Sequence, residues 1–171
     1  MSTPRILFVC LGNICRSPAA EIICRQLAKD SNIALHIDSC GTASYHVGSA
    51  PDARMQAALR QLGYRYDGHK ARQFSPRDFE QFELIIAQDE QNKRDILRLA
   101  RSPEHQAKVH SMSEWFPAAW KNKHSSVPDP YYGGQQGFEE VIHLLHDSCQ
   151  LLLEELKSPC KMSTDSKYNP K

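Results

Sequence analysis

The sequence predicts a single-domain α/β fold in three layers, with a four-stranded parallel sheet flanked by helices on both faces. Two observations predict it. Continuous apolar runs at residues 6–9 and 84–87 are typical of strands buried on both faces of a parallel sheet. Stretches with the apolar spacing of helices alternate with the strand candidates, which implies a parallel sheet covered on both sides. The 171 residues suit one domain with a proper core.

The first strand is joined to the first helix by a short loop of functional side chains. Ser17 is expected to be the N-cap of this helix and Pro18 its first helical residue. Apolar residues then recur at i, i+3, i+4 and i+7 on one helical face: Ala20, Ile23, Cys24 and Leu27. Residues 10–16 therefore lie at the carboxyl end of a strand, where open α/β sheets bind their ligands.

The central elements follow from the same patterns. Leu35 and Ile37 alternate with polar residues before Ser39 and predict a second strand, and residues 41–50 predict a loop. A helix is expected to begin at Pro51 and Asp52 and to end before Gly63, a typical C′ residue. Its expected buried face consists of four apolar residues: Met55, Ala58, Leu59 and Leu62.

The C-terminal half is expected to add a strand, two helices and a long loop. Asp89 can cap a helix that carries Ile96, Leu97 and Leu99, and residues 109–112 predict a weaker strand. Residues 113–137 hold several prolines and glycines and predict a long functional loop. The final helix is strongly periodic, with these apolar positions: Phe138, Val141, Ile142, Leu145, Cys149, Leu152 and Leu156. Residues 158–171 are polar and predict a disordered tail, which leaves 1–157 as the domain.

Composition excludes several classes of function. The formal charge of +1 argues against binding to nucleic acid or to an anionic membrane surface. No apolar stretch approaches the roughly 20 residues of a membrane span, and no secretory signal is visible. The six cysteines show no zinc-ligand spacing: Cys10, Cys15, Cys24, Cys40, Cys149 and Cys160. A reducing cytoplasm is the expected compartment, with Cys24 and Cys149 as ordinary core residues.

The loop from Cys10 to Arg16 combines a nucleophile, backbone amides and a fixed cation. The Cys-x5-Arg spacing lets a tight loop return on itself, so that Arg16 lies over the sulfur of Cys10. The N–H groups of residues 11–16 can then turn inward as an anion-binding nest, which Gly12 and Asn13 permit because they tolerate positive φ. The following helix directs its positive end at the same point. Such a cradle suits a phosphate-sized dianion and favours a thiolate at Cys10.

Two segments resemble the low-molecular-weight protein tyrosine phosphatase family. Residues 9–21 (VCLGNICRSPAAE) resemble the family's signature, and residues 129–134 (DPYYGG) resemble its general-acid loop. The resemblance runs over residues 4–157. It implies the same four-stranded fold, hydrolysis of phosphotyrosine and aryl phosphates through a cysteinyl-phosphate, and no metal or organic cofactor. It also implies phosphotyrosine proteins as partners, a tyrosine kinase among them, and a monomer or weak dimer.

Three residues are expected to carry the chemistry. Cys10 is the expected nucleophile, and Arg16 is expected to bind two phosphoryl oxygens in a bidentate fork. Asp129, between two prolines, is expected to protonate the leaving oxygen and later to activate water. The expected phosphate-binding residues form one run: Leu11, Gly12, Asn13, Ile14, Cys15 and Arg16.

The resemblance also implies supporting and substrate-lining residues. It implies that Asn13 holds the backbone of the loop and that Ser39 and His69 bind Asn13. Ser17 can donate a hydrogen bond to the Cys10 sulfur. Asp89 matches a carboxylate near the family's pocket, with Gln88 where the family usually has methionine. The expected apolar and aromatic lining is drawn from three regions: Leu11, Ile14, Tyr45, Tyr131 and Tyr132.

Several alternatives stay open at the level of sequence. Cys15 could form a reversible disulfide with an oxidised Cys10, which makes a redox-sensing phosphate-binding protein one alternative. Protein-arginine phosphatases resemble the family and typically carry threonine where Ile14 stands. Arsenate reduction needs further cysteines downstream, and none lies between Cys40 and Cys149. A non-enzymatic phosphotyrosine binder is disfavoured because Cys10 and Asp129 are present. His143 and His146 have helical i, i+3 spacing but no evident further metal ligands.

Overall fold

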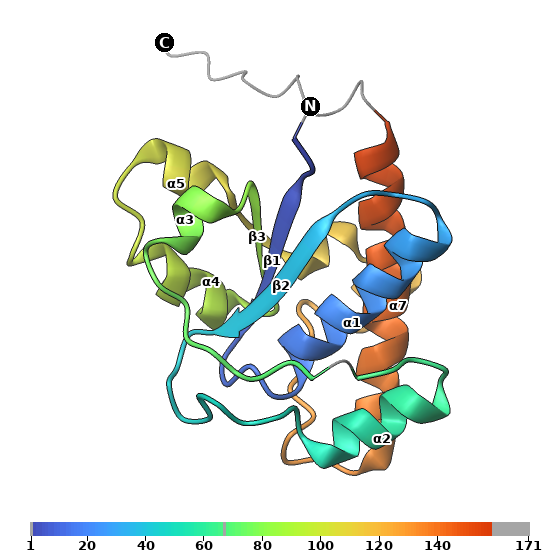
Figure 1. Ribbon diagram of the computed structural model, residues 1–171. Helices are drawn as coiled ribbons and strands as arrows, with labels where there is room; N and C mark the ends of the chain where they lie inside the picture. Colours follow the sequence, from blue (N-terminus) through green and yellow to red (C-terminus); the bar gives the residue numbers. More distant parts are fainter. Residues whose placement is uncertain (1, 67, 159–171) are drawn as a thin grey trace.

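A four-stranded parallel sheet forms the centre of the molecule, as Figure 1 shows. The computed structural model describes residues 2–66 and 68–158. The strands are β1 (Arg5–Cys10), β2 (His36–Gly41), β3 (Leu84–Ala87) and β4 (Val109–Ser111), in the spatial order β2-β1-β3-β4. The predicted fold class is thereby confirmed. Apart from residue 158, the tail expected at 158–171 lies outside the described residues, and so does Cys160.

The sheet places the end of β1 at its topological switch point. β1 pairs with β2 on one side and with β3 on the other. The chain therefore first adds β2 at one edge of β1 and later adds β3 and β4 at the opposite edge. Cys10, the last residue of β1, lies opposite Gly41, the last residue of β2. Ligands bind in the crevice at such a point because the neighbouring connections diverge to opposite faces.

Successive residues of β1 supply two separate cores, because side chains of a strand alternate between the faces of the sheet. Ile6 and Phe8 belong to the larger core, which is covered by α1 (Arg16–Asp30) and α7 (Gln135–Lys157). Leu7 and Val9 belong to the smaller core on the opposite face. All four side chains are at most 1% exposed, and burial of each contributes about 1.5–3 kcal/mol.

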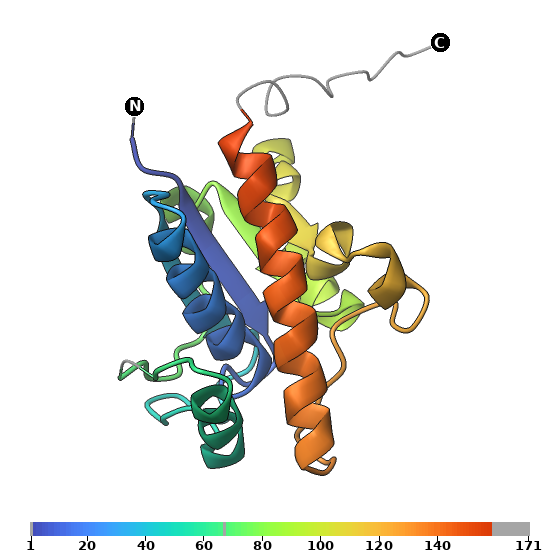
Figure 2. The same cartoon turned by 90° about the vertical axis from the view of Figure 1, so that its right-hand side faces the viewer.

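Helices cover both faces of the sheet, as the three-layer prediction requires. Figure 2 shows α1 and α7 side by side over one face of β1, and these two helices share many contacts. α2 (Ala53–Gln61) packs against α7 on the same side. The helices α3 (Asp78–Gln81), α4 (Glu90–Leu97) and α5 (Pro103–Ala107) lie on the other side of the sheet in Figure 1. None of the helices in the described segments is both long enough and apolar enough to cross a membrane.

The expected start of α1 is wrong by two residues. The helix begins at Arg16, with Cys15 at the N-cap position and no capping side chain. Ser17 and Pro18 therefore lie inside the first turn, where the missing N–H of a proline costs no helical hydrogen bond. The helix thus starts without the serine cap that the sequence predicts.

The helices predicted after Pro51 and after Asp89 are both present, but each ends earlier than the sequence predicts. Asp52 caps α2 by accepting from the Arg54 N–H at 2.8 Å, and Gly63 follows with φ of +90°. Leu62 and Leu99, expected on buried faces, fall just beyond α2 and α4 and are 38% and 42% exposed.

The expected long loop at 113–137 contains short helices that the prolines and glycines hid. These are η1 (Met112–Trp115) and α6 (Ala118–Lys121), and η1 also takes Met112 from the expected strand. Trp115 and Trp120 donate through Nε1 to Glu155 at 2.5 Å and Asp147 at 2.7 Å, so both hold this segment against α7. α7 itself starts three residues earlier than Phe138.

Candidate active site

The phosphate loop, residues 10–16, is held in shape by the side chain of Asn13. Asn13 adopts a left-handed backbone with φ of +56° and is fully buried. Its amide nitrogen donates to Ser17 Oγ at 2.8 Å and to Ser39 Oγ at 3.0 Å. Its amide oxygen lies 2.9 Å from His69 Nε2. Asparagine tolerates this conformation better than most residues, and four buried or half-buried partners offset what strain remains.

The fourth partner extends this network to the next segment of the chain. The Arg72 N–H donates to Asn13 Oδ1 at 3.1 Å, and the Arg72 guanidinium pairs with Asp38 and Asp78, each at 3.0 Å. Burial opposes the charge of Asp38, but Arg72 outweighs it and holds the pKa of Asp38 below its usual value. Asn13 is therefore tied to β2 and to the segment that leads to α3.

Gly41 provides the space in which the phosphate loop lies. A Cβ atom on Gly41 would lie 2.6 Å from the Leu11 carbonyl oxygen and 3.1 Å from the Asn13 nitrogen. Real Cβ atoms essentially never approach backbone so closely, so only glycine fits without moving the loop. Gly41, at the end of β2, thus lets the backbone of the phosphate loop pack directly against this strand.

Cys10 sits at the floor of the pocket with polar partners directed at its sulfur. The residue is 3% exposed, and its Sγ lies 3.0 Å from Ser17 Oγ. The Asn13 backbone N–H donates to the same sulfur at 3.3 Å. Ser17 is not the helix cap, but its expected contact with the Cys10 sulfur is present. Its Oγ also lies 3.2 Å from the Cys40 carbonyl oxygen, so its one hydroxyl proton has two acceptors within reach.

Arg16 is a buried cation held between two carboxylates. Its Nη1 donates to Asp89 Oδ2 at 2.7 Å and to the Val127 carbonyl at 3.1 Å. Its Nη2 lies 3.6 Å from Asp129 Oδ2. Burial disfavours the charge, but Cys10 and then Asp89 outweigh it and raise the pKa of Arg16. The guanidinium is therefore oriented before any substrate enters.

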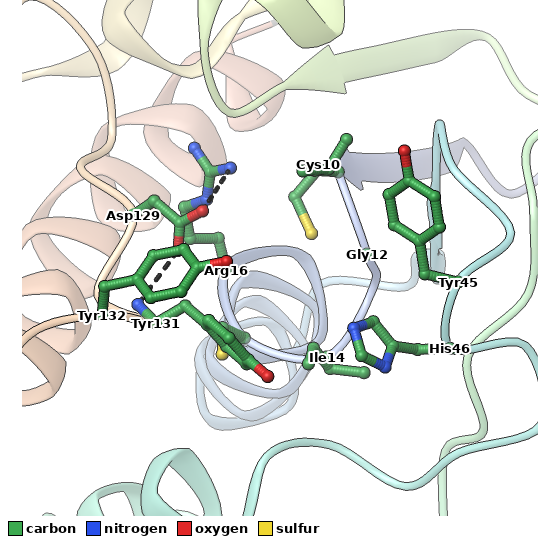
Figure 3. A pocket seen from close by; sticks show the side chains of 11 residues that line it. Cys10, Gly12, Ile14, Arg16, Tyr45, His46, Asp129, Tyr131 and Tyr132 are labelled. Carbon is green, nitrogen blue, oxygen red and sulfur yellow. Dashed lines mark hydrogen bonds and ion pairs between the residues drawn. The ribbon is translucent and has the colours of Figure 1, made fainter.

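Asp129 stands at the mouth of the pocket on a loop without helix or strand, the acid loop, residues 127–134. Its side chain is 42% exposed, and its Oδ1 accepts from the Tyr131 N–H at 3.1 Å. Figure 3 shows Asp129 and Arg16 on one side of Cys10, with Tyr45 and His46 on the other. A carboxyl here can reach a group bonded to a phosphorus atom above Cys10.

The pocket is a cavity of about 150 Å³ whose lining joins three segments of the chain. Its walls are the following residues: Cys10, Leu11, Gly12, Ile14, Cys15, Arg16, Tyr45, His46, Asp129, Tyr131 and Tyr132. The structure thus brings together every residue expected at the pocket mouth. Tyr131 and Tyr132 pack edge to face with ring centroids 4.9 Å apart, whereas Tyr45 and Tyr132 are 77% and 94% exposed.

Two residues at this site were missed from the sequence. His46 lines the pocket beside Gly12, and its ring centroid lies 6.4 Å from that of Tyr131. Arg54 lies over the Tyr131 ring at 5.4 Å from its centroid. The adjacency of His46 to Tyr45 could have indicated the first. No sequence signal marks Arg54, because the acid loop that it contacts is far away along the chain.

Cys15 lines the pocket below Cys10 as a buried thiol. It is 4% exposed, and burial, then the neighbouring Asp52, raises its pKa well above the ordinary value. Cys24 and Cys149 are fully buried in the larger core, as expected. The cysteines at positions 10, 15, 24, 40 and 149 are all free thiols.

One cluster in the described part of the chain has the spacing of metal ligands. Ligand atoms of Glu21, Asp38 and His69 all lie within 4.8 Å of one another. Asp38 is engaged by Arg72 at 3.0 Å, and His69 by Asn13 at 2.9 Å. These contacts fit a support for the phosphate loop. His146, which has helical i, i+3 spacing with His143, pairs with its neighbour Asp147 at 3.2 Å.

Comparisons with known proteins agree with this geometry. A family model described as low molecular weight phosphotyrosine protein phosphatase matches residues 5–162. A low molecular weight protein-tyrosine-phosphatase of Streptomyces coelicolor is 39% identical over 157 residues, which cover 91% of this chain and 94% of the relative.

Solved structures show the same likeness over the whole fold. A protein tyrosine phosphatase of Entamoeba histolytica superposes with a TM-score of 0.85 at 37% identity, covering 91% of this chain and 97% of that one. A Drosophila arginine phosphatase superposes with a TM-score of 0.82 at 32% identity, covering 90% and 98%.

Proposed function

The chain belongs to the low molecular weight phosphotyrosine protein phosphatase family, and we propose that it hydrolyses phosphotyrosine and aryl phosphates through a cysteinyl-phosphate intermediate. The observation that carries the proposal is the convergence of Cys10, Arg16 and Asp129 on one pocket. These three supply a nucleophile, a cation for the phosphoryl oxygens and a proton donor.

In the first step the Cys10 thiolate attacks phosphorus. The S–P bond forms as the P–O bond to the phenol breaks, and Asp129 gives its proton to the leaving oxygen. The amides of residues 11–16 and the fork of Arg16 bind the equatorial oxygens. Their contacts strengthen as charge spreads over those oxygens in the transition state.

In the second step water hydrolyses the cysteinyl-phosphate. Asp129, now ionised, takes a proton from the water as its oxygen attacks phosphorus, and the S–P bond breaks to release inorganic phosphate. Ser17 Oγ, 3.0 Å from Cys10 Sγ, is placed to donate to the departing thiolate. Each group ends the cycle in its starting state, so the reaction consumes water alone and needs no cofactor.

The walls of the pocket favour an aromatic ring. Tyr45 and Tyr131 line the pocket from opposite sides in Figure 3, and the apolar Leu11 and Ile14 belong to the same lining. Aromatic contacts of this kind contribute about 0.5–1.5 kcal/mol beyond the burial of area. Tyrosine side chains on phosphorylated proteins, a tyrosine kinase among them, are accordingly the proposed substrates, and a reducing cytoplasm is the proposed compartment.

Hydrolysis in EDTA and fresh thiol tests the proposal. Reduced protein is offered p-nitrophenyl phosphate, a phosphotyrosine peptide and a phosphoarginine protein, with Cys10→Ser and Asp129→Asn as variants. We expect turnover of the first two substrates that Cys10→Ser abolishes and Asp129→Asn slows. If the reduced wild type turned over none of the three, the site would be a phosphate-binding or redox site instead.

Phosphoarginine is the second candidate substrate because of the likeness to the Drosophila arginine phosphatase. Ile14 argues against it, since its side chain is 9% exposed and presents only carbon to the pocket. A guanidinium loses hydrogen bonds to water against such a wall. Faster turnover of phosphoarginine than of phosphotyrosine would move the assignment to this class.

Cys15 is proposed to protect Cys10 from irreversible oxidation. Peroxide would convert the Cys10 thiolate to a sulfenic acid and release water. The Cys15 thiol would then condense with the sulfenic acid to form a disulfide and release a second water. Added thiol would reduce this disulfide. The support for this proposal is that both thiols line one small cavity.

A further inference from the structure

Arg54, in the first turn of α2, contacts three other residues from separate parts of the molecule. Its Nε and Nη2 donate to the two oxygens of Asp52 at 3.1 and 3.0 Å. Nη2 also donates to the Tyr131 carbonyl at 2.9 Å. The guanidinium carbon lies 5.4 Å from the centroid of the Tyr131 ring and 4.8 Å from that of Phe138. A surface arginine with this many contacts is positioned with more precision than solubility requires.

These contacts connect the phosphate loop to the acid loop across the pocket. The Asp52 N–H donates to the Ile14 carbonyl at 2.7 Å, which fastens the start of α2 to the phosphate loop. Asp52 orients Arg54, and Arg54 holds the Tyr131 carbonyl. The Tyr131 N–H in turn donates to Asp129 Oδ1 at 3.1 Å. A continuous chain of hydrogen bonds therefore runs from the loop that binds phosphate to the carboxyl that protonates the leaving group.

Little else fixes this part of the acid loop. Within residues 2–66 and 68–158, Arg54 is the hydrogen-bond donor to the Tyr131 carbonyl. The Gly133 N–H bonds back to Pro130 within the loop itself, at 3.0 Å. Tyr132 is almost fully exposed. The direction of the Asp129 carboxyl therefore depends on Arg54, together with the ion pair between Asp129 Oδ2 and Arg16 Nη2 at 3.6 Å.

We propose that Arg54 is a positioning residue for Asp129, acting through the Tyr131 backbone while Asp52 orients its guanidinium. This inference rests on the proposed function and adds a requirement to it. Because Arg54 acts through the proton donor, its importance must rise with the basicity of the leaving group. A misplaced acid slows the expulsion of a basic phenolate, whereas an acidic phenolate departs without a proton.

The test compares Arg54→Met with wild type on aryl phosphates whose phenols grow more acidic: phenyl, p-nitrophenyl and 2,4-dinitrophenyl phosphate. Methionine keeps much of the packing on Tyr131 and Phe138 but donates no hydrogen bond. We expect kcat/KM to fall about ten- to a hundredfold for phenyl phosphate, whose phenol has a pKa of about 10 like tyrosine, and less than about threefold for the dinitrophenyl ester.

Arg60→Met is the matched control. Arg60 is an exposed arginine at the other end of α2 and lies outside the pocket lining. The Arg60→Met variant should have the same kcat/KM as the wild type for all three esters. Equal losses for all esters in Arg54→Met, with or without a lowered melting temperature, would overturn the proposal, because a general structural effect does not depend on the leaving group.

A double-mutant cycle with Asp129→Asn separates this inference from the proposed function. If Arg54 acts through Asp129, adding Arg54→Met to Asp129→Asn should lower kcat/KM for phenyl phosphate by less than about twofold more. A full additional loss in that background would overturn the inference. Failure of Asp129→Asn itself to slow phenyl phosphate would overturn the proposed function instead.

Discussion

The phosphate loop and the acid loop face each other across one pocket but are held in opposite ways. In the phosphate loop the residues Cys10, Asn13 and Arg16 are at most 3% exposed. Asn13 alone has four buried or half-buried partners. In the acid loop the Asp129 side chain is 42% exposed and Tyr132 94%. The groups proposed to bind the phosphoryl group are thus fixed by the fold, whereas the proposed proton donor depends on a few contacts at the surface.

Phosphoryl binding and proton donation, the two functions proposed for these loops, therefore have separate structural supports. Changes in the phosphate loop should affect every substrate and, where buried partners are lost, the stability of the fold. Changes in the acid loop should leave the fold intact and affect substrates according to their leaving groups. Variants of each region can break or sharpen that contrast.

The largest effect is expected from Cys10→Ser. Serine keeps the size of the side chain and its contact with Ser17, so the fold should survive, but a hydroxyl is a far weaker nucleophile at neutral pH. We expect kcat/KM to fall by at least about a thousandfold for every aryl phosphate, independent of the leaving group. A steady-state assay checks this, and circular dichroism confirms folding. Substantial residual turnover by the serine variant would contradict a cysteinyl intermediate.

Asp129→Asn should give the next largest effect, with a different signature. Asparagine has no proton to give, so kcat/KM for phenyl phosphate should fall about 10²–10⁴-fold. The loss should shrink steadily as the phenol becomes more acidic, and thermal stability should stay as in the wild type. A plot of log kcat/KM against leaving-group pKa measures this. A uniform loss across the series would mean that Asp129 binds rather than protonates the substrate.

Asn13→Ala should show how the phosphate loop depends on its buried network. The change leaves the partners of the amide group, among them Ser39 and His69, with unmatched hydrogen bonds, and forces alanine into a left-handed backbone. We expect the free energy of unfolding to fall by about 1–3 kcal/mol. Urea titration checks this, with the exposed Tyr132→Phe as a control expected to be neutral. A variant as stable as the wild type would contradict the proposed difference between the loops.

Cys15→Ser should change recovery from oxidation. After brief treatment with peroxide, wild type should regain most of its activity on adding dithiothreitol, whereas the variant should regain only a minor part. Peptide mapping should find a Cys10–Cys15 disulfide in oxidised wild type. Finding only sulfonic acid at Cys10 would refute the protective role.

The smallest effect concerns acid stability near the phosphate loop. Arg72 holds the pKa of Asp38 below its usual value, so ionised Asp38 stabilises the fold above about pH 4, and this contribution is lost as the pH falls further. Asp38→Asn should therefore flatten the dependence of the urea midpoint on pH between about pH 6 and pH 3. An unchanged slope would show that the ion pair contributes nothing measurable.

The fold was largely predictable because its signals are local. The buried strands at residues 6–9 and 84–87, the Asp89 cap and the C′ residue Gly63 each depend on neighbours within a few positions. The short helices η1 and α6 were missed because prolines and glycines around them suggested loop, although tryptophan contacts with α7 stabilise them. Tertiary packing, not local preference, decides such short elements.

The site was predictable where one segment carries it. The loop from Cys10 to Arg16 is contiguous, so its spacing alone indicated a phosphate cradle. The contact of Ser17 with the Cys10 sulfur was expected, but its role as the cap was wrong because the helix begins at Arg16, before the Ser-Pro pattern that indicated the start. His46 and Arg54 were missed because long-range contacts bring them to the pocket, and no local pattern records such contacts.

Gly41 shows how a residue without chemistry can be as indispensable as a nucleophile. A methyl group there would push against the backbone of Leu11 from 2.6 Å and displace the phosphate loop as a whole. In a genetic screen for inactive alleles, substitutions of Gly41 are therefore expected beside those of Cys10. Every amino acid with a side chain brings a Cβ atom to this position, so all of them meet the same obstacle.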